Sequence, residues 1–212
     1  MRIALDIDGV ILDFERTMRT YAELYDLLLL KKDGIKNQTE FDYLNRYNWT
    51  ADEKKEFIDN YLFYATLYKT PLIPLAKEII EILKIEGHQI CFITARGLIN
   101  PENKDAVIKV LKKNNIEINN IYWGIKDKVS KCKELKIDLI IEDNPNICKE
   151  LVKNKIKTLY FRDKNSKILK ENDDLKEISN LGEVCRHLMS KNNLKNSSDT
   201  YNKILKNERR NK

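Results

Sequence analysis

Short apolar runs that each end in polar residues recur along this chain, and they restrict its fold more than any other feature. Each run is rich in aliphatic or aromatic residues and has the length of a buried strand. Between the later runs, apolar residues recur at the spacing of one helix face. Buried strands alternating with amphipathic helices predict an α/β fold: a mostly parallel sheet in a three-layer, Rossmann-like core. The five predicted strands cover residues 2–7, 89–94, 121–123, 139–141 and 157–161.

The segment between the first two runs is much longer than an ordinary crossover. It contains two helical patterns, and Pro71 and Pro74 follow it. We therefore expect residues 13–70 to form a small helical cap above a catalytic core made by residues 1–12 and 71–189. The first pattern consists of Phe14, Met18, Tyr21, Tyr25, Leu28 and Leu29, and the second of Phe57, Tyr61, Tyr64 and Tyr68.

Charge and composition exclude several classes of protein. The chain carries a net charge of +6, most of it in residues 191–212, so the remainder offers no basic surface and nucleic acid is not an expected partner. Residues 190–212 are predicted to be a basic, flexible tail. Neither a membrane-spanning run nor a signal-peptide pattern is present, which favours a cytoplasmic protein without a membrane partner. The few glycines do not cluster as a Walker A loop or a dinucleotide fingerprint requires.

Polar side chains follow the predicted strands at the point where each strand ends. Because right-handed crossovers bring the carboxyl ends of parallel strands to one edge, these side chains are expected to share a cleft. They are Asp6, Asp8, Thr94, Arg96 and the pair Glu142-Asp143. Lys126 and Lys128, where a helix opens after the third run, lie within reach of the same edge.

Asp6 and Asp8 are the most specific feature of this set. Two carboxylates so close together in an apolar neighbourhood repel one another unless they share a proton or a cation, and oxygen ligands suit Mg²⁺. A calcium loop is excluded because apolar residues 10–12 replace the polar ligands it needs. Carboxylate, hydroxyl, lysine and acidic pair on successive strand ends form the inventory that phosphoryl transfer requires.

In this order the residues resemble the haloacid dehalogenase superfamily of aspartate-dependent phosphatases, over roughly residues 1–165. Asp6 and Asp8 match its first motif, Thr94 its second, Lys128 its third and Glu142-Asp143 its fourth, with Lys126 as the competitor for the third role. Residues 5–10, 93–97 and 141–144, together with a cap after the first motif, resemble more narrowly the cytosolic 5′(3′)-deoxyribonucleotidase, or type C 5′-nucleotidase, family.

The resemblance implies a Mg²⁺-dependent hydrolase of nucleoside monophosphates that works through an aspartyl-phosphate. In that family pattern Asp6 is the nucleophile, and Asp8 is the general acid and base. The metal is held by Asp6, Asp8 (through its backbone carbonyl) and Asp143. Glu142 replaces an aspartate of the motif, so its place among the metal ligands stays open. Phosphate oxygens are held by Thr94, Ala95, Arg96 and Lys128.

Aromatic residues of the cap could stack on a nucleobase, although packing within the cap would require the same residues. The predicted substrate pocket consists of Phe14, Phe57, Tyr61 and Tyr64. Three alternatives to the nucleotidase remain open: another small phosphate ester as substrate, a nucleic-acid 3′-phosphate, or a nucleotide-binding protein without turnover. The sequence also leaves open whether Arg96 grips phosphate or pairs with Glu142, which base and which phosphate are preferred, and whether the chain forms a homodimer.

Overall fold

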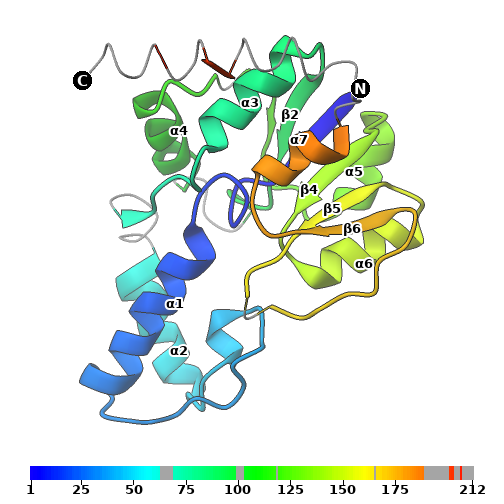
Figure 1. Cartoon of the computed structure of the whole chain (residues 1–212). Coiled ribbons are helices and arrows are strands. Elements are labelled where there is room, and N and C mark those ends of the chain that lie inside the picture. The colour runs from blue at the N-terminus through cyan, green and yellow to red at the C-terminus, as the bar shows by residue number, and fades with distance from the viewer. Residues whose placement is uncertain are drawn as a thin grey trace.

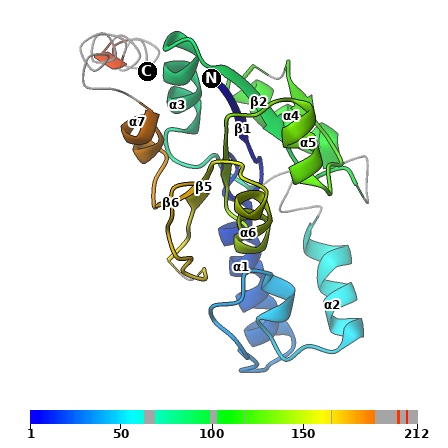
Figure 2. The ribbon, with the colours of Figure 1, turned by 90° about the vertical axis from the view of Figure 1, so that its right-hand side faces the viewer.

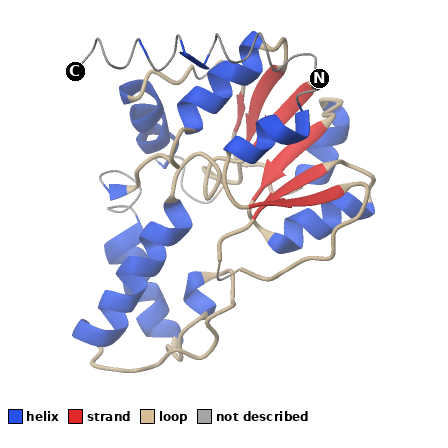
Figure 3. Cartoon of the chain, viewed as in Figure 1, coloured by secondary structure: helices blue, strands red, loops and turns tan. Residues whose placement is uncertain are grey.

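A six-stranded parallel sheet forms the centre of the computed structural model, which describes residues 1–62, 69–98, 103–117, 119–164, 166–188, 201–202 and 206. The strand order is β3-β2-β1-β4-β5-β6, so β1 and β4 lie side by side in the middle. Figure 3 shows the strands in red at the centre of this part of the chain, with helices around them. The strands are β1 (Arg2–Leu5), β2 (Gln89–Ile93), β3 (Ile121–Tyr122), β4 (Leu139–Glu142), β5 (Thr158–Phe161) and β6 (Leu175–Ile178).

The parallel α/β architecture confirms the prediction, but the predicted number of five strands is wrong. The missing strand is β6, an edge strand that pairs only with β5. Leu175 and Ile178 are buried, whereas Lys176 and Glu177 between them are half-buried. An edge strand needs no continuous apolar run, and a pattern with two charges at its centre lacks the signal that identified the other strands.

Helices cover both faces of the sheet (Figures 1 and 2). Alternate residues of a strand point to opposite faces. Ile3 therefore joins the core beneath α3 (Ala76–Ile85), α4 (Asn103–Lys113) and α7 (Gly182–Leu188), while Ala4 joins the core beneath α5 (Lys128–Glu134) and α6 (Pro145–Lys153). This arrangement brings the carboxyl ends of all the strands to the edge that faces the inserted helical segment.

The inserted segment lies between β1 and α3 and extends beyond that edge (Figure 1). Its main helices are packed around an aromatic core, in which the ring of Tyr25 lies 5.0 Å from that of Trp49 and 5.4 Å from that of Phe57. A capping box between Thr50 and Glu53 fixes the start of the second α-helix. The elements are α1 (Phe14–Leu24), the π-helical turn η1 (Tyr25–Leu29), the 3₁₀ turn η2 (Tyr43–Asn45), α2 (Ala51–Phe57) and the π-helical turn η3 (Ile58–Leu62).

The prediction that the apolar face of the first cap helix continues beyond Tyr25 is wrong. Leu28 and Leu29 are 60% and 59% exposed. The chain changes from α- to π-helical winding at Tyr25, and a π turn holds more residues than an α turn, so the following side chains leave the buried face. Tyr64, Tyr68 and most of the predicted tail 190–212 lie outside the described residues. None of the described helices has the length and apolar character needed to span a membrane.

Candidate active site

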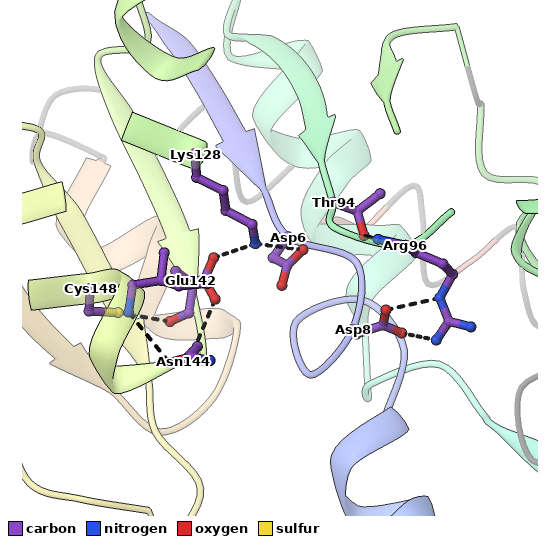
Figure 4. A network of polar contacts seen from close by, with 9 residues as sticks. Asp6, Asp8, Thr94, Arg96, Lys128, Glu142, Asn144 and Cys148 are labelled. Atoms are coloured by element: carbon purple, nitrogen blue, oxygen red, sulfur yellow. Dashed lines mark hydrogen bonds and ion pairs between the residues drawn. The ribbon is translucent and has the colours of Figure 1, made fainter. Parts of the chain in front are cut away.

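The residues predicted from the strand ends converge on the edge of the sheet where β1 and β4 meet (Figure 4). Asp6 directly follows β1, Glu142 ends β4, and Thr94 follows β2. The backbone N–H of Asp6 donates to the Ile141 carbonyl at 3.0 Å, so the pairing of β1 and β4 continues to the first residue of the site. Sheet hydrogen bonds therefore fix the positions of these acidic side chains before any ligand binds.

Lys128 occupies the centre of this group. Its side chain is buried, and Nζ lies 2.9 Å from Asp6 Oδ1 and donates to Glu142 Oε2 at 2.6 Å. The Asp127 carboxylate caps α5 by accepting from Ser130 N at 3.0 Å, which holds Lys128 in the first turn of the helix. Lys126 is exposed, so Lys128 is the lysine that reaches Asp6.

The neighbouring carboxylates keep Lys128 protonated and positively charged. Burial alone would lower the pKa of Lys128, but the carboxylates of Asp6 and Glu142 outweigh it and raise that pKa above its ordinary value. Burial raises the pKa of Asp6 to about 7, although Lys128 opposes that shift. Burial, followed by the neighbouring carboxylates Glu142 and Asp6, raises the pKa of Asp143 well above its usual range. One lysine therefore does not balance the three buried acids, and the site favours an additional cation.

Asp6, Glu142 and Asp143 offer carboxylate oxygens that all lie within 4.8 Å of one another, a donor set that suits Mg²⁺. Both oxygens of Glu142 already accept hydrogen bonds, one from Lys128 and the other from Asn144 N at 3.1 Å. Asp6 and Asp143 therefore carry the oxygens of this trio that are least engaged by protein donors, and we expect them to be the main ligands of a metal ion. The Asp143 carboxylate lies directly against Gly9. Gly9 has a φ of +78°, and a Cβ at this position would collide with the Asp143 carboxylate.

Asp8 and Arg96 form a bidentate ion pair on the other side of Asp6 (Figure 4). Arg96 Nε donates to Asp8 Oδ2 at 2.9 Å, and Nη2 pairs with Asp8 Oδ1. The guanidinium also lies over the ring of Phe14, 4.7 Å from its centroid, and the Arg96 backbone N–H donates to Thr94 Oγ1 at 3.1 Å. Arg96 thus links the first and second sequence motifs through Asp8, a partner that the sequence did not suggest.

The aromatic residues predicted to line the substrate pocket lie mostly inside the cap. Phe57 has an exposed fraction of 0% and packs against Trp49 and Tyr61, so in this structure it offers no surface to a base. Tyr61 is half-buried and stacks on Phe57, and Phe14 is buried beneath Arg96. Tyr64 lies outside the described residues. Packing within the cap, the alternative left open by the sequence, accounts for Phe57.

A cleft of about 680 Å³ runs from the acidic site to the inserted helical segment. Gly9 and Asp143 line its inner end, and Ala95 is exposed close to Thr94. Sequence reasoning missed most of the remaining lining, in particular Arg19, Phe41 and Arg46 from the inserted segment and Phe161 and Arg162 from the core. The one available signal was Arg19, a charged residue directly after Met18 on an otherwise apolar helix face.

Comparisons with known proteins agree on the fold. No protein-family model matches the chain. A candidate nucleotidase from Bacillus cereus is 24% identical over 158 residues, which cover 72% of this chain and 81% of the relative. A haloacid dehalogenase-like hydrolase from Streptococcus pneumoniae superposes with a TM-score of 0.61 at 15% identity, covering 89% of this chain and 98% of the other. CbbY from Rhodobacter sphaeroides, in complex with xylulose 1,5-bisphosphate, gives a TM-score of 0.54 at 14% identity, covering 86% and 95%.

These matches identify the fold as that of the haloacid dehalogenase-like hydrolases. The resemblance found in the sequence motifs is thereby confirmed at the level of the fold.

Proposed function

We propose that the chain is a Mg²⁺-dependent phosphomonoesterase that hydrolyses nucleoside monophosphates through a phosphorylated Asp6. The observation that carries the proposal is the buried Asp6 carboxylate, whose Oδ1 pairs with Lys128 at 2.9 Å and which shares an acidic cluster with Asp143. A nucleophilic carboxylate must be ionised and held in one orientation, and the lysine contributes to both. The similarity to a candidate nucleotidase from Bacillus cereus supports the choice of substrate class.

In the proposed reaction, the free oxygen of Asp6 attacks the phosphorus atom and the bond to the leaving alcohol breaks. Lys128 retains its contact with Asp6 Oδ1 and, with the Thr94 hydroxyl, stabilises the negative charge that builds on the phosphoryl oxygens. Asp8 gives a proton to the leaving oxygen and then removes one from the water that hydrolyses the aspartyl-phosphate. A divalent cation held by Asp6 and Asp143 would supply further positive charge to the phosphate.

The ion pair between Asp8 and Arg96 gives Arg96 a role in this sequence of events. While both oxygens of Asp8 accept from the guanidinium, neither is available to a leaving group. A phosphate dianion that enters the site competes for the same guanidinium, since arginine binds phosphate in the same forked geometry as it binds carboxylate. Transfer of Arg96 from Asp8 to the phosphate would release the Asp8 carboxylate once substrate is bound, and Asp8 would then take up a proton from solvent or from the substrate phosphate before it acts as an acid.

Another small phosphate ester is the second candidate substrate. Phe57 is fully buried, so the cap offers fewer stacking surfaces for a base than its composition suggests. Phe41 and Phe161 are the aromatic residues that line the cleft. A phosphorylated sugar or acid would need hydrogen-bonding and charged groups more than stacking surfaces, and the cleft contains several of these.

The test is phosphate release from a panel of 5′- and 3′-nucleoside monophosphates and small phosphate esters, with and without Mg²⁺. Asp6→Asn should abolish turnover, whereas Asp59→Asn removes an exposed carboxylate of the inserted segment and should leave it unchanged. Activity that survives Asp6→Asn, or that is unaffected by chelation of divalent metal, would contradict the proposed mechanism. Hydrolysis of phosphate esters without any nucleotide in the panel would shift the assignment to the second candidate.

A further inference from the structure

Two buried arginines line the cleft opposite the acidic site. Arg19 belongs to α1 and Arg46 follows the η2 turn, and their exposed fractions are 8% and 6%. Both line the same cleft as Gly9 and Asp143. Charged side chains are seldom buried to this extent unless their donors and charge are matched by partners.

The donors of these arginines are only partly used. Arg19 Nη1 lies 3.1 Å from Asp163 Oδ2, but Nε and Nη2 make no hydrogen bond among the residues that the structure describes. Arg46 Nη1 donates to the Glu40 carbonyl at 3.1 Å. Burial, followed by the nearby Arg19 guanidinium, lowers the pKa of Arg46, so the two cations are close enough to repel one another. Arginine remains charged under such conditions.

Other charged residues around the cleft do not neutralise the positive charge of Arg19 and Arg46. Arg16 pairs with Asp13 at 3.5 Å, and Arg162 pairs with Glu177 at 2.5 Å. Glu15 also lines the cleft, but burial raises its pKa to about 8, so its carboxyl is mainly neutral at physiological pH.

Lys164 and Glu23 add one charge of each sign to the lining, and Glu23 is close enough to Arg46 to raise its pKa, whereas Asp143 at the inner end belongs to the acidic site. Asp163 pairs with Arg19 and is close enough to Arg46 to oppose the lowering of its pKa, while Arg19, which has donors without a partner among the described residues, lines a space large enough for a small molecule.

We propose that Arg19 and Arg46 bind a second anionic group of the substrate, a phosphate or a carboxylate, while the phosphate to be hydrolysed lies at Asp6. The inference rests on the phosphatase function proposed above, and it shifts the expected substrate from nucleoside monophosphates with a single phosphate to phosphomonoesters that carry a second anionic group. The guanidinium fork matches both phosphate and carboxylate oxygens, so the shared chemistry is an oxyanion. A nucleoside 3′,5′-bisphosphate and a short phosphorylated carboxylic acid both meet this description.

The experiment measures binding by calorimetry in Asp6→Asn, which should bind substrates without turning them over. Two matched ligand pairs separate the two sources of the second anion: deoxyadenosine 5′-monophosphate against its 3′,5′-bisphosphate, and ethyl phosphate against phosphoglycolate. We expect the second anion to tighten binding about tenfold or more in one pair, as charge-assisted hydrogen bonds in a buried site allow. The pair that shows the gain identifies the anion.

Variants then assign the gain to the arginines. Arg46→Met and Arg19→Met, each in the Asp6→Asn background, should remove most of the gain while the partner ligand with one phosphate binds as before. Arg19→Lys retains the positive charge, so it should keep part of the gain. It therefore shows whether a loss in Arg19→Met comes from the missing charge or from a folding defect. Arg186→Met is the matched control, because Arg186 is an exposed arginine of α7 that does not line the cleft. It should leave the gain unchanged.

The outcomes separate this inference from the proposed function. Equal affinity within both ligand pairs, no binding of any of the four ligands, or an equal loss in Arg186→Met would overturn the anion subsite. If unsubstituted protein still releases phosphate from monoesters in those cases, the phosphatase function stands without it. An arginine-dependent gain in a protein that hydrolyses none of the four ligands would support the subsite and contradict the phosphatase function.

Discussion

Replacing Lys128 by methionine should destabilise the protein strongly, and the loss should depend on pH. The side chain is 3% exposed and contacts both Asp6 and Glu142. Methionine fills a similar volume but leaves buried carboxylates without their counter-charge. Removal of one partner from a buried ion pair costs about 3–5 kcal/mol, and two partners are affected here. For a chain of this size, that corresponds to a fall in Tm of roughly 6–20 °C.

The sign of the pH dependence follows from the raised pKa of Asp6. With a folded-state pKa of about 7, Asp6 is ionised and paired with Lys128 above that pH and largely neutral below it. Because the folded-state pKa of Asp6 is raised, ionisation of Asp6 costs stability as the pH rises through 7, and the contact with Lys128 offsets part of that cost only where Asp6 is ionised. The difference in Tm between Lys128→Met and the unsubstituted protein should be large at pH 8 and smaller at pH 5.

The assay is thermal unfolding followed by circular dichroism at both pH values, without added metal. Lys126→Met is the matched control, since Lys126 is exposed and only two residues away, and its Tm should change by little. The double variant Lys128→Met/Glu142→Gln should recover part of the loss, because one of the unpaired carboxylates is then neutral. Equal losses in Lys126→Met and Lys128→Met, or a loss that does not vary with pH, would refute the reasoning.

Three further predictions concern other parts of the site and the cap. Burial raises the pKa of Glu15 from 4.5 to about 8, so the stability that Glu15 contributes below pH 4.5 is lost as the pH rises towards 8. Denaturant titrations should show a flatter pH dependence for Glu15→Gln than for the unsubstituted protein, and parallel curves would count against it. Phe57→Ala should lower the free energy of unfolding by about 3–5 kcal/mol with little effect on KM, whereas a large change in KM with unchanged stability would restore Phe57 to the substrate pocket. Gly9→Ala should weaken Mg²⁺ binding, measured by calorimetry, because its Cβ would displace the Asp143 carboxylate; unchanged affinity would exclude Asp143 as a ligand.

The sheet and the position of the site could be predicted because both depend on local patterns. Apolar runs mark buried strands wherever a strand has neighbours on both sides, and β6 escaped detection because it lies at the edge with Lys176 and Glu177 at its centre. Parallel connections then bring the strand ends together whatever the side chains are. Asp6, Thr94 and Glu142 reached one edge for this reason.

The pairing of side chains within the site could not be predicted in the same way. The ion pair of Asp8 with Arg96 joins residues from two different loops, and its formation depends on loop geometry that no periodicity encodes. The exposed Leu28 and Leu29 result from a change of helical winding at Tyr25, for which the sequence offered no breaker residue. Arg19 and Arg46 approach one another only through the folded shape of the inserted segment.

Chemical trapping of the phosphorylated carboxylate tests the central claim most directly. The protein is mixed with Mg²⁺ and a phosphomonoester that it hydrolyses, quenched with acid, and treated with borohydride, which reduces an aspartyl-phosphate to homoserine. Mass spectrometry of the N-terminal peptide should find homoserine at position 6 after turnover and none without substrate. Homoserine at any other aspartate, or steady hydrolysis with an unmodified Asp6, would contradict the account.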